Sequence, residues 1–283
     1  MADVRDVETK AFKGFDATAA RRRCMQYRRR ILDISQKVTA LHAAPAFSCI
    51  EMTDVIYQGL MRRAPNGKDF DDAFLMSKGH GCMTQYAILE DLGILSSEEL
   101  DRYCTPQGIL GAHPDRGNPG IEASTGSLGH GMGIATGMAH AEKILKSGKR
   151  IFAVLSDGEL QEGSSWEGAM MAANLRLDNL LVFVDLNDFG GLERMSESHT
   201  AFYPLREKFE SFGWESAVVN GHDCLAIHRA VTDRRGERPF ALLCQTVKGR
   251  GVAFMEHIPI WHYRSPNKEE YATALRELAE VSA

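Results

Sequence analysis

The amino-acid sequence predicts an α/β protein built on a doubly wound, mostly parallel sheet with helices on both faces. Three apolar runs, at residues 151–155, 180–184 and 240–244, are continuous rather than alternating. Continuous apolar runs are typical of strands in a parallel sheet whose two faces are both covered. Segments with the helical spacing of apolar residues lie between these runs, and alternating strands and helices indicate a doubly wound sheet.

Three helices are expected before the first of these strands. The first covers residues 17–40, the second runs from Ile50 to Met61, and the third follows Gly81 through Leu89. The first helix carries two runs of arginine, Arg21–Arg23 and Arg28–Arg30. We interpret these runs as a solvated helix face rather than as a nucleic-acid-binding patch.

Further helices are expected at residues 164–175, 204–212 and 224–233, and a fourth strand at Glu215–Val219. In doubly wound sheets, ligands bind at the carboxyl ends of the strands. The sequence therefore places the candidate site just after Leu155, Val184 and Cys244.

The composition is that of an ordinary globular protein, and the length of 283 residues leads us to expect a single domain over residues 1–283. The formal net charge of −5 argues against nucleic-acid binding, which normally requires a basic surface. The six cysteines form no Cys-x-x-Cys pair, so neither a zinc site nor a redox dithiol is indicated. We find no secretory signal and no apolar run of membrane-spanning length, so we expect a cytoplasmic protein without a membrane partner.

An aspartate and an asparagine follow two of the predicted strands. Asp157-Gly158 comes after the strand that ends near Leu155, and Asn187 comes after the strand that ends near Val184. Oxygen ligands of this kind suit Mg²⁺ or Ca²⁺ rather than zinc, and a glycine lets a phosphate approach the backbone amides. The pair is typical of a metal–diphosphate site. Read separately, Asp157 is more simply a helix cap and Asn187 a turn residue.

A glycine-rich segment, residues 124–137, precedes a helix of small residues. Glycines at this density allow the first turn of a helix to pack tightly, and they leave its backbone amides open to an anion. A tight helix-packing surface explains the same segment equally well.

Four of the ten histidines, His42, His80, His113 and His262, lie in polar or glycine-flanked segments that suit loops. Histidines there can hydrogen-bond sugar hydroxyls and move protons near neutral pH, although a structural role is the simpler interpretation of any one of them alone. Glu162 and Glu167 follow Asp157 on a predicted helix, where they are either solvated carboxylates or a carboxylate relay.

Taken together, these segments resemble the N-terminal, diphosphate-binding domain of the transketolase family. The similarity extends over nearly the whole chain, and its motifs occur in the order of the family. These motifs are Ser77-Lys-Gly-His-Gly81, His113-Pro-Asp115, Ser124-Thr-Gly-Ser-Leu-Gly129, Ser156-Asp-Gly-Glu-Leu-Gln-Glu-Gly163, Val184-Asp-Leu-Asn187, Lys248-Gly-Arg-Gly-Val252, Phe254-Met-Glu256 and Trp261-His262.

The resemblance implies a role for each matching position. Asp157, Asn187 and the main-chain oxygen of Phe189 are implied to bind a divalent metal, Mg²⁺ or alternatively Ca²⁺ or Mn²⁺. The residues implied to contact thiamine diphosphate are His80, Gly126, Leu128, Gly158, Glu159, Asn187 and His262. The implied catalytic groups are His42, His80, His113 and His262, with Glu162 and Glu167 as a carboxylate relay near the subunit contact.

The resemblance also implies a reaction and a partner. Thiamine diphosphate would supply the carbanion, and a two-carbon ketol unit would pass from a ketose or ketose phosphate to an aldose. Full-length transketolases continue into a pyrimidine-binding domain and a C-terminal domain. Since nothing after residue 275 can encode them, we expect a separate partner chain, active sites at the interface, and an α2β2 assembly.

The sequence departs from the family pattern at Ser156 in place of glycine, at His130 in place of glutamine, at Tyr263-Arg264 after the Trp-His pair, and in the metal-loop segment Asp185-Leu-Asn-Asp-Phe-Gly-Gly191. The last two departures could reshape the substrate channel, and they suggest an unusual sugar substrate as a hypothesis. Two alternatives remain open. One is a subunit of another thiamine-diphosphate enzyme, such as a deoxyxylulose-phosphate-synthase-like carboligase or a dehydrogenase. The other is a catalytically silent cofactor-binding subunit.

Overall fold

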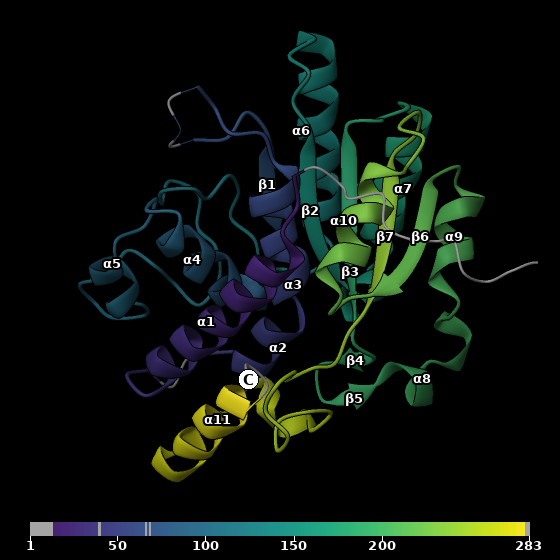
Figure 1. Cartoon of the computed structure of the whole chain (residues 1–283). Coiled ribbons are helices and arrows are strands. Elements are labelled where there is room, and N and C mark those ends of the chain that lie inside the picture. The colour runs from purple at the N-terminus through teal and green to yellow at the C-terminus, as the bar shows by residue number, and fades with distance from the viewer. Residues whose placement is uncertain (1–13, 39–40, 66, 68, 281–283) are drawn as a thin grey trace, which may run out of the picture.

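The computed structural model describes residues 14–38, 41–65, 67 and 69–280 (Figure 1). A five-stranded, fully parallel sheet forms its centre. In spatial order, the strands are β1 (Ala73–Met76), β2 (Ile151–Ser156), β3 (Leu180–Leu186), β7 (Phe240–Gln245) and β6 (Glu215–Asn220). A separate two-stranded hairpin, β4 (Phe189–Gly190) with β5 (Glu193–Arg194), follows β3.

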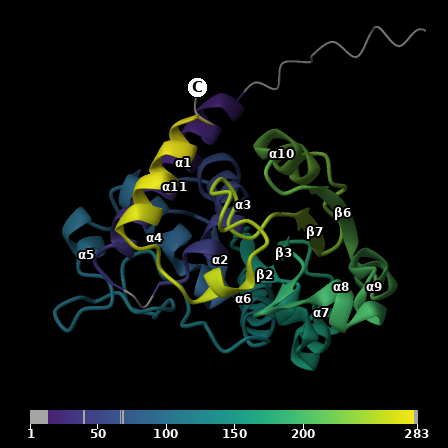
Figure 2. The same cartoon turned by 90° about the horizontal axis from the view of Figure 1, so that it is seen from below.

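Helices fill most of the remaining chain. The α-helices are α1 (Ala17–Ser35), α2 (Ala43–Ser48), α3 (Ile50–Asp54), α4 (Cys82–Asp91), α5 (Ser97–Asp101), α6 (Gly131–Leu145), α7 (Gly163–Asn174), α8 (Met195–Ser198), α9 (Leu205–Ser211), α10 (Cys224–Thr232) and α11 (Lys268–Glu280). A π-helical turn, η1 (Val55–Leu60), continues α3, and the short 3-10 turns are η2 (Gly79–Gly81), η3 (Gly158–Gln161), η4 (Thr200–Phe202) and η5 (Pro259–His262). Figures 1 and 2 show α11 lying beside α1.

Two separate cores, one on each face of the sheet, hold these layers together. Because successive side chains of a strand point to opposite faces, one strand contributes to both cores. Phe152, Phe183 and Phe240 pack among α1–α4, α10 and α11. Their neighbours Ala153 and Val182 pack against α6, α7 and α9. The predicted doubly wound, parallel architecture with helices on both faces is confirmed.

Most predicted elements are present at the expected places. The four predicted strands correspond to β2, β3, β6 and β7, and the helices expected at 164–175, 204–212 and 224–233 to α7, α9 and α10. The helix expected over 17–40 ends at Ser35, and its residues 39–40 lie outside the described part of the chain. β1 was not predicted, because four apolar residues after an acidic segment are too short to distinguish by pattern.

The interpretation of the arginine runs as a solvated face is wrong for Arg28, which is 2% exposed. Its guanidinium forms an ion pair with Glu51 (2.7 Å) and donates to the main-chain oxygen of Arg250 (2.9 Å). Arg23 pairs with the buried Asp54 (2.7 Å). The physical reason is that α1 packs against α3, α4 and α11, so part of its charged surface is covered and meets acidic partners.

Among the described residues, no helix is both long enough and apolar enough to cross a membrane.

Candidate active site

A cavity of about 450 Å³ opens at the carboxyl edge of the sheet. Since all five strands are parallel, the loops after β1, β2, β3 and β7 converge at this edge. The sequence-predicted residues that line the cavity are His42, His80, His113, Gly126, Leu128, Gly158, Glu162, Asn187, Phe189 and His262. The site therefore lies where the strand-end rule predicts it.

Asp157 lies at the end of β2, directly beneath this cavity lining. Its carboxylate is fully buried and accepts the backbone N–H groups of Gly158 (2.9 Å) and Asp188 (2.6 Å). Burial, and then the neighbouring Asp185 carboxylate, raises the pKa of Asp157 to about 7. Within the described residues, no cation forms an ion pair with it. A divalent metal would supply the positive charge that this carboxylate lacks.

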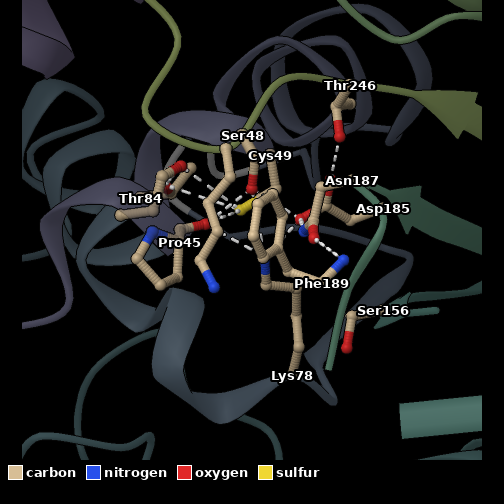
Figure 3. Close-up of polar contacts among 12 residues, drawn as sticks. Pro45, Ser48, Cys49, Lys78, Thr84, Ser156, Asp185, Asn187, Phe189 and Thr246 are labelled. Atoms are coloured by element: carbon tan, nitrogen blue, oxygen red, sulfur yellow. Dashed lines mark hydrogen bonds and ion pairs between the residues drawn. The ribbon is translucent and has the colours of Figure 1, made fainter. Parts of the chain in front are cut away.

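The side chain of Asn187 is held in one orientation by Asp185 (Figure 3). Its Nδ2 donates to Oδ2 of Asp185 (2.9 Å), and its Oδ1 accepts the N–H of Phe189 (3.0 Å). An ionised carboxylate only accepts hydrogen bonds, so the amide must present Nδ2 to Asp185. The Asn187 oxygen is thereby turned away from Asp185 and is kept available as a ligand atom.

Asp185 is itself anchored by Lys78, which follows β1. The two form a fully buried ion pair, and Asp185 also accepts hydrogen bonds from the hydroxyls of Ser48 (2.6 Å) and Thr246. Lys78 additionally donates to the main-chain oxygen of Pro45 (2.9 Å). Burial by itself would lower the pKa of Lys78, but Asp185 raises it above its ordinary range; the pKa of Asp185 is correspondingly lowered by Lys78. Both groups are therefore charged.

The backbone at Gly158 leaves room for a ligand beside these oxygens. A Cβ atom at this position would lie 3.1 Å from the main-chain oxygen of Phe189 and 3.2 Å from Cα of Gly190. A side chain here would fill the space between η3 and β4. The arrangement suits the close approach of a diphosphate to the backbone amides.

The four predicted histidines come from four separate segments and meet in the cavity. The ring centroid of His42 lies 6.1 Å from His80, 6.0 Å from His113 and 5.5 Å from His262. His80 and His262 lie 5.3 Å apart. Together they form a wall of imidazole nitrogens that can bind hydroxyl groups.

Burial sets the charge state of these histidines. Burial, and then the neighbouring His113, lowers the pKa of His42 to about 4. Burial and Lys248 lower the pKa of His262 to about 3, and burial lowers the pKa of His80 well below its ordinary range. These three rings are therefore neutral at pH 7, and a neutral ring has one nitrogen that donates a hydrogen bond and one that accepts a hydrogen bond.

Sequence reasoning missed Lys248 as a site residue. It follows β7, lines the cavity, and donates from Nζ to Nδ1 of His262 (2.7 Å) and to the main-chain oxygen of Gly191 (2.9 Å). Burial, and then Lys78, lowers the pKa of Lys248 to about 7. Tyr263 also lines the cavity, with its ring 4.4 Å from His262. The position of Lys248 after the third predicted strand end was the available signal.

Three predicted residues do not line the cavity. Asp157 lies beneath it, as described above. Glu159 is fully buried, accepts hydrogen bonds from Ser77 and from Gly129 N–H (3.1 Å), and leaves its second oxygen unpartnered. Glu167 is exposed on α7, outside the lining.

Among the described residues, no three His, Cys, Asp or Glu side chains gather at metal-binding distance. The predicted metal ligands are one carboxylate, one amide oxygen and one main-chain oxygen. Such a set does not require a cluster of three His, Cys, Asp or Glu side chains. A metal held by so few protein ligands completes its shell with phosphate oxygens and water.

Comparison with known proteins places the site in a family. Residues 20–277 match the family model for the thiamine diphosphate binding domain of transketolase. This chain belongs to the transketolase family. Among curated transketolase relatives, the chain is 35% identical to one of the subunits of an apulose-4-phosphate transketolase from Phocaeicola vulgatus, over 89% of this chain and 91% of that protein. It is 33% identical to a 6-deoxy-6-sulfo-D-fructose transketolase subunit from a Clostridium strain, over 86% of this chain and 90% of that protein.

Solved transketolase structures share the fold. The Campylobacter jejuni transketolase superposes with a TM-score of 0.85 at 24% identity, over 94% of this chain and 43% of that one. The Leishmania mexicana transketolase gives a TM-score of 0.74 at 23% identity, over 95% of this chain and 45% of that one. The chain thus spans less than half the length of these solved transketolases. The predicted family, its thiamine-diphosphate-binding domain and its fold are confirmed.

Proposed function

We propose that this chain is the thiamine-diphosphate-binding subunit of a two-chain transketolase, with residues 1–283 forming one cofactor-binding domain. The assembled enzyme would transfer a two-carbon ketol unit from a ketose or ketose phosphate to an aldose. The observation that carries the proposal is a single cavity lined both by four histidines and by the strand ends that bear Gly158 and Asn187. This cavity combines hydroxyl-binding groups with a cradle for a metal-bound diphosphate.

The residues fit the cofactor and its metal. Asp157, Asn187 and the main-chain oxygen of Phe189 would hold the divalent cation, and Gly158 would admit the diphosphate. Lys248 adds an amine to the lining, and the protonated form of that amine suits a diphosphate. The bound cofactor supplies the carbanion for carbon–carbon cleavage.

The histidines would bind and orient the sugar and would move protons at its hydroxyl groups. Nδ1 of His42 is buried and has no hydrogen-bond partner within the described residues, so it is free to accept a hydrogen bond from a substrate hydroxyl. Lys248 donates to Nδ1 of His262, which leaves the proton of that ring on Nε2. His262 would therefore act as a donor at Nε2, and His42 as an acceptor.

Two findings support a separate partner chain that carries the pyrimidine-binding domain. The chain covers 91% of a relative whose name describes one subunit of a transketolase, and it covers only 43% of a solved transketolase chain. We propose an α2β2 assembly with active sites between unlike subunits. Glu162, exposed at the rim of the cavity, and Glu167 would lie near that interface.

For the substrate, we propose a sugar or sugar phosphate outside the common pentose phosphates. The relatives named above belong to an apulose-4-phosphate and a 6-deoxy-6-sulfo-D-fructose transketolase. Tyr263, 59% exposed, places an aromatic ring beside His42 and His262 and would restrict the entrance. A substrate panel in which pentose phosphates clearly outcompete every other ketose would contradict this part of the proposal.

The test is ketol transfer with thiamine diphosphate and Mg²⁺, measured for this chain alone and together with a pyrimidine-domain chain from the same genome. We expect activity only in the mixture. Asp157→Ala should abolish it, while the matched control Asp178→Ala, at a half-exposed surface carboxylate, should leave it intact.

The other outcomes separate the alternatives. An inactive mixture that still binds the cofactor would indicate another thiamine-diphosphate carboligase or synthase. A complex that binds no cofactor would indicate a catalytically silent subunit.

A further inference from the structure

A second cavity, of about 230 Å³, lies beside the cofactor cavity but shares no lining residue with it. Its polar lining consists of Arg21 and Arg28 of α1, Glu51 of α3, His222 after β6, and Arg250 after β7. The two cavities meet at the segment after β7, where Lys248 lines one and Arg250 lines the other. Figure 2 shows this segment crossing from β7 towards α1 and α11.

The one carboxylate in the lining is already neutralised. Glu51 pairs with Arg28 at 2.7 Å and accepts a hydrogen bond from Nδ1 of His222 at 3.0 Å. Nε2 of His222 accepts the N–H of Val247 at 2.8 Å, so the proton of this ring lies on Nδ1. Arg28 also donates to main-chain oxygens, including that of Arg250. Glu51 thus adds little negative charge to the cavity.

Two guanidinium groups remain available. Arg21 is exposed and has no ion-pair partner within the described residues. Arg250 is 49% exposed, and its nearest carboxylate, Glu256, lies 3.5 Å away and also accepts the N–H of Gly251 (3.0 Å). The cavity is therefore lined by two incompletely paired arginines, while its one carboxylate, Glu51, is already neutralised.

We propose that this cavity is a second anion-binding site, specific for a phosphate group on a small molecule or for inorganic phosphate itself. Arginine forks match phosphate oxygens in a bidentate manner, and two forks from different elements can hold one phosphate. The volume is below the range of pockets for drug-sized ligands, which restricts the occupant to a small anion. The inference does not depend on ketol transfer.

An anion in this cavity would contact the segment that presents Lys248 to the cofactor. That segment is held by Gly249 N–H on the main-chain oxygen of Ala44 (3.1 Å) and by Val247 N–H on His222. The site thus lies next to the active centre without being part of it.

The experiment is a calorimetric titration of the full chain with inorganic phosphate, at constant ionic strength and against a chloride blank. Arg21→Ser and Arg250→Ser should each weaken phosphate binding about tenfold, since each removes a charge-assisted contact. Arg22→Ser, at an exposed neighbour on α1 that does not line the cavity, is the matched control and should bind as the wild type does. Lys248→Met should also keep the phosphate affinity, because that amine lines the other cavity. Circular dichroism checks that each variant is folded.

Three results would overturn the proposal. The first is a wild type that shows no phosphate binding up to about 10 mM phosphate. The second is equal phosphate binding by Arg21→Ser, Arg250→Ser and Arg22→Ser. The third is a loss of binding in Lys248→Met alone, which would place the anion in the cofactor cavity.

Discussion

The buried Lys78–Asp185 pair is the feature whose removal tests the architecture of the site most directly. In Lys78→Met, a carboxylate with no exposed surface loses its counter-charge but keeps its hydrogen bonds from Ser48, Thr246 and Asn187. Removing one partner of a buried ion pair costs about 3–5 kcal/mol, because it leaves an uncompensated charge. For a chain of this size, about 1 kcal/mol corresponds to roughly 2–4 °C in Tm, so the melting temperature should fall by roughly 6–20 °C.

The matched control is Lys149→Met, the same substitution at a partly exposed lysine that lies 4.0 Å from Glu142. An exposed pair of this kind contributes about 0–1 kcal/mol, so the control should lower Tm by a few degrees at most. Both variants and the wild type are compared by thermal denaturation at one protein concentration.

A double-mutant cycle with Asp185→Asn measures the interaction energy between Lys78 and Asp185 apart from their contacts with other residues. The double variant removes both charges, so it should be less destabilised than the sum of the two single variants by about 2 kcal/mol or more. Asp185→Asn alone should also weaken metal binding, because an amide can donate to Asn187 and permit its side chain to turn. The reasoning is refuted if Lys78→Met loses no more stability than Lys149→Met, or if the two single effects simply add.

Three other perturbations have defined outcomes. Burial alone would raise the pKa of Asp72, but hydrogen bonds from its two arginine partners lower it to about 2. Its contribution of about 2 kcal/mol to the free energy of unfolding is therefore present above pH 4 and lost as the pH falls towards 2. In urea titrations, the difference in the free energy of unfolding between wild type and Asp72→Asn should therefore shrink as the pH falls from 4 towards 2. A difference that stays constant over this range would contradict the assigned role of the ionised Asp72 carboxylate. Gly126→Ala should destabilise the fold by more than about 1 kcal/mol, because φ is +131° and the new Cβ would lie 2.7 Å from the His113 ring. The control is Gly133→Ala, at an open helical position, which should be neutral or slightly stabilising. Both variants are measured by urea titration. Lys248→Met should weaken thiamine diphosphate binding by the two-chain complex by roughly ten- to a hundredfold in calorimetry, and an unchanged affinity would remove this lysine from the site.

The sequence by itself determined the layers of the fold and one edge of the site. Continuous apolar runs predicted β2, β3 and β7 because a strand buried on both faces cannot carry alternating polar residues. The strand-end rule then brought Asp157 and Asn187 together, since neighbouring parallel strands end at the same edge. These inferences needed only local pattern and the direction of the chain.

The tertiary structure decided which distant groups meet. Lys78 and Asp185 are 107 positions apart, and the four histidines come from four segments with no common spacing, so no local pattern could pair them. Their association in the sequence argument rested on resemblance to a family. The burial of Arg28 was missed for the same reason: a charge pattern indicates which side chains prefer water, whereas burial depends on what packs above them. Periodicity is a property of neighbouring residues, while ion pairing and cavity shape arise only when helices and strands from the whole chain enclose the same space.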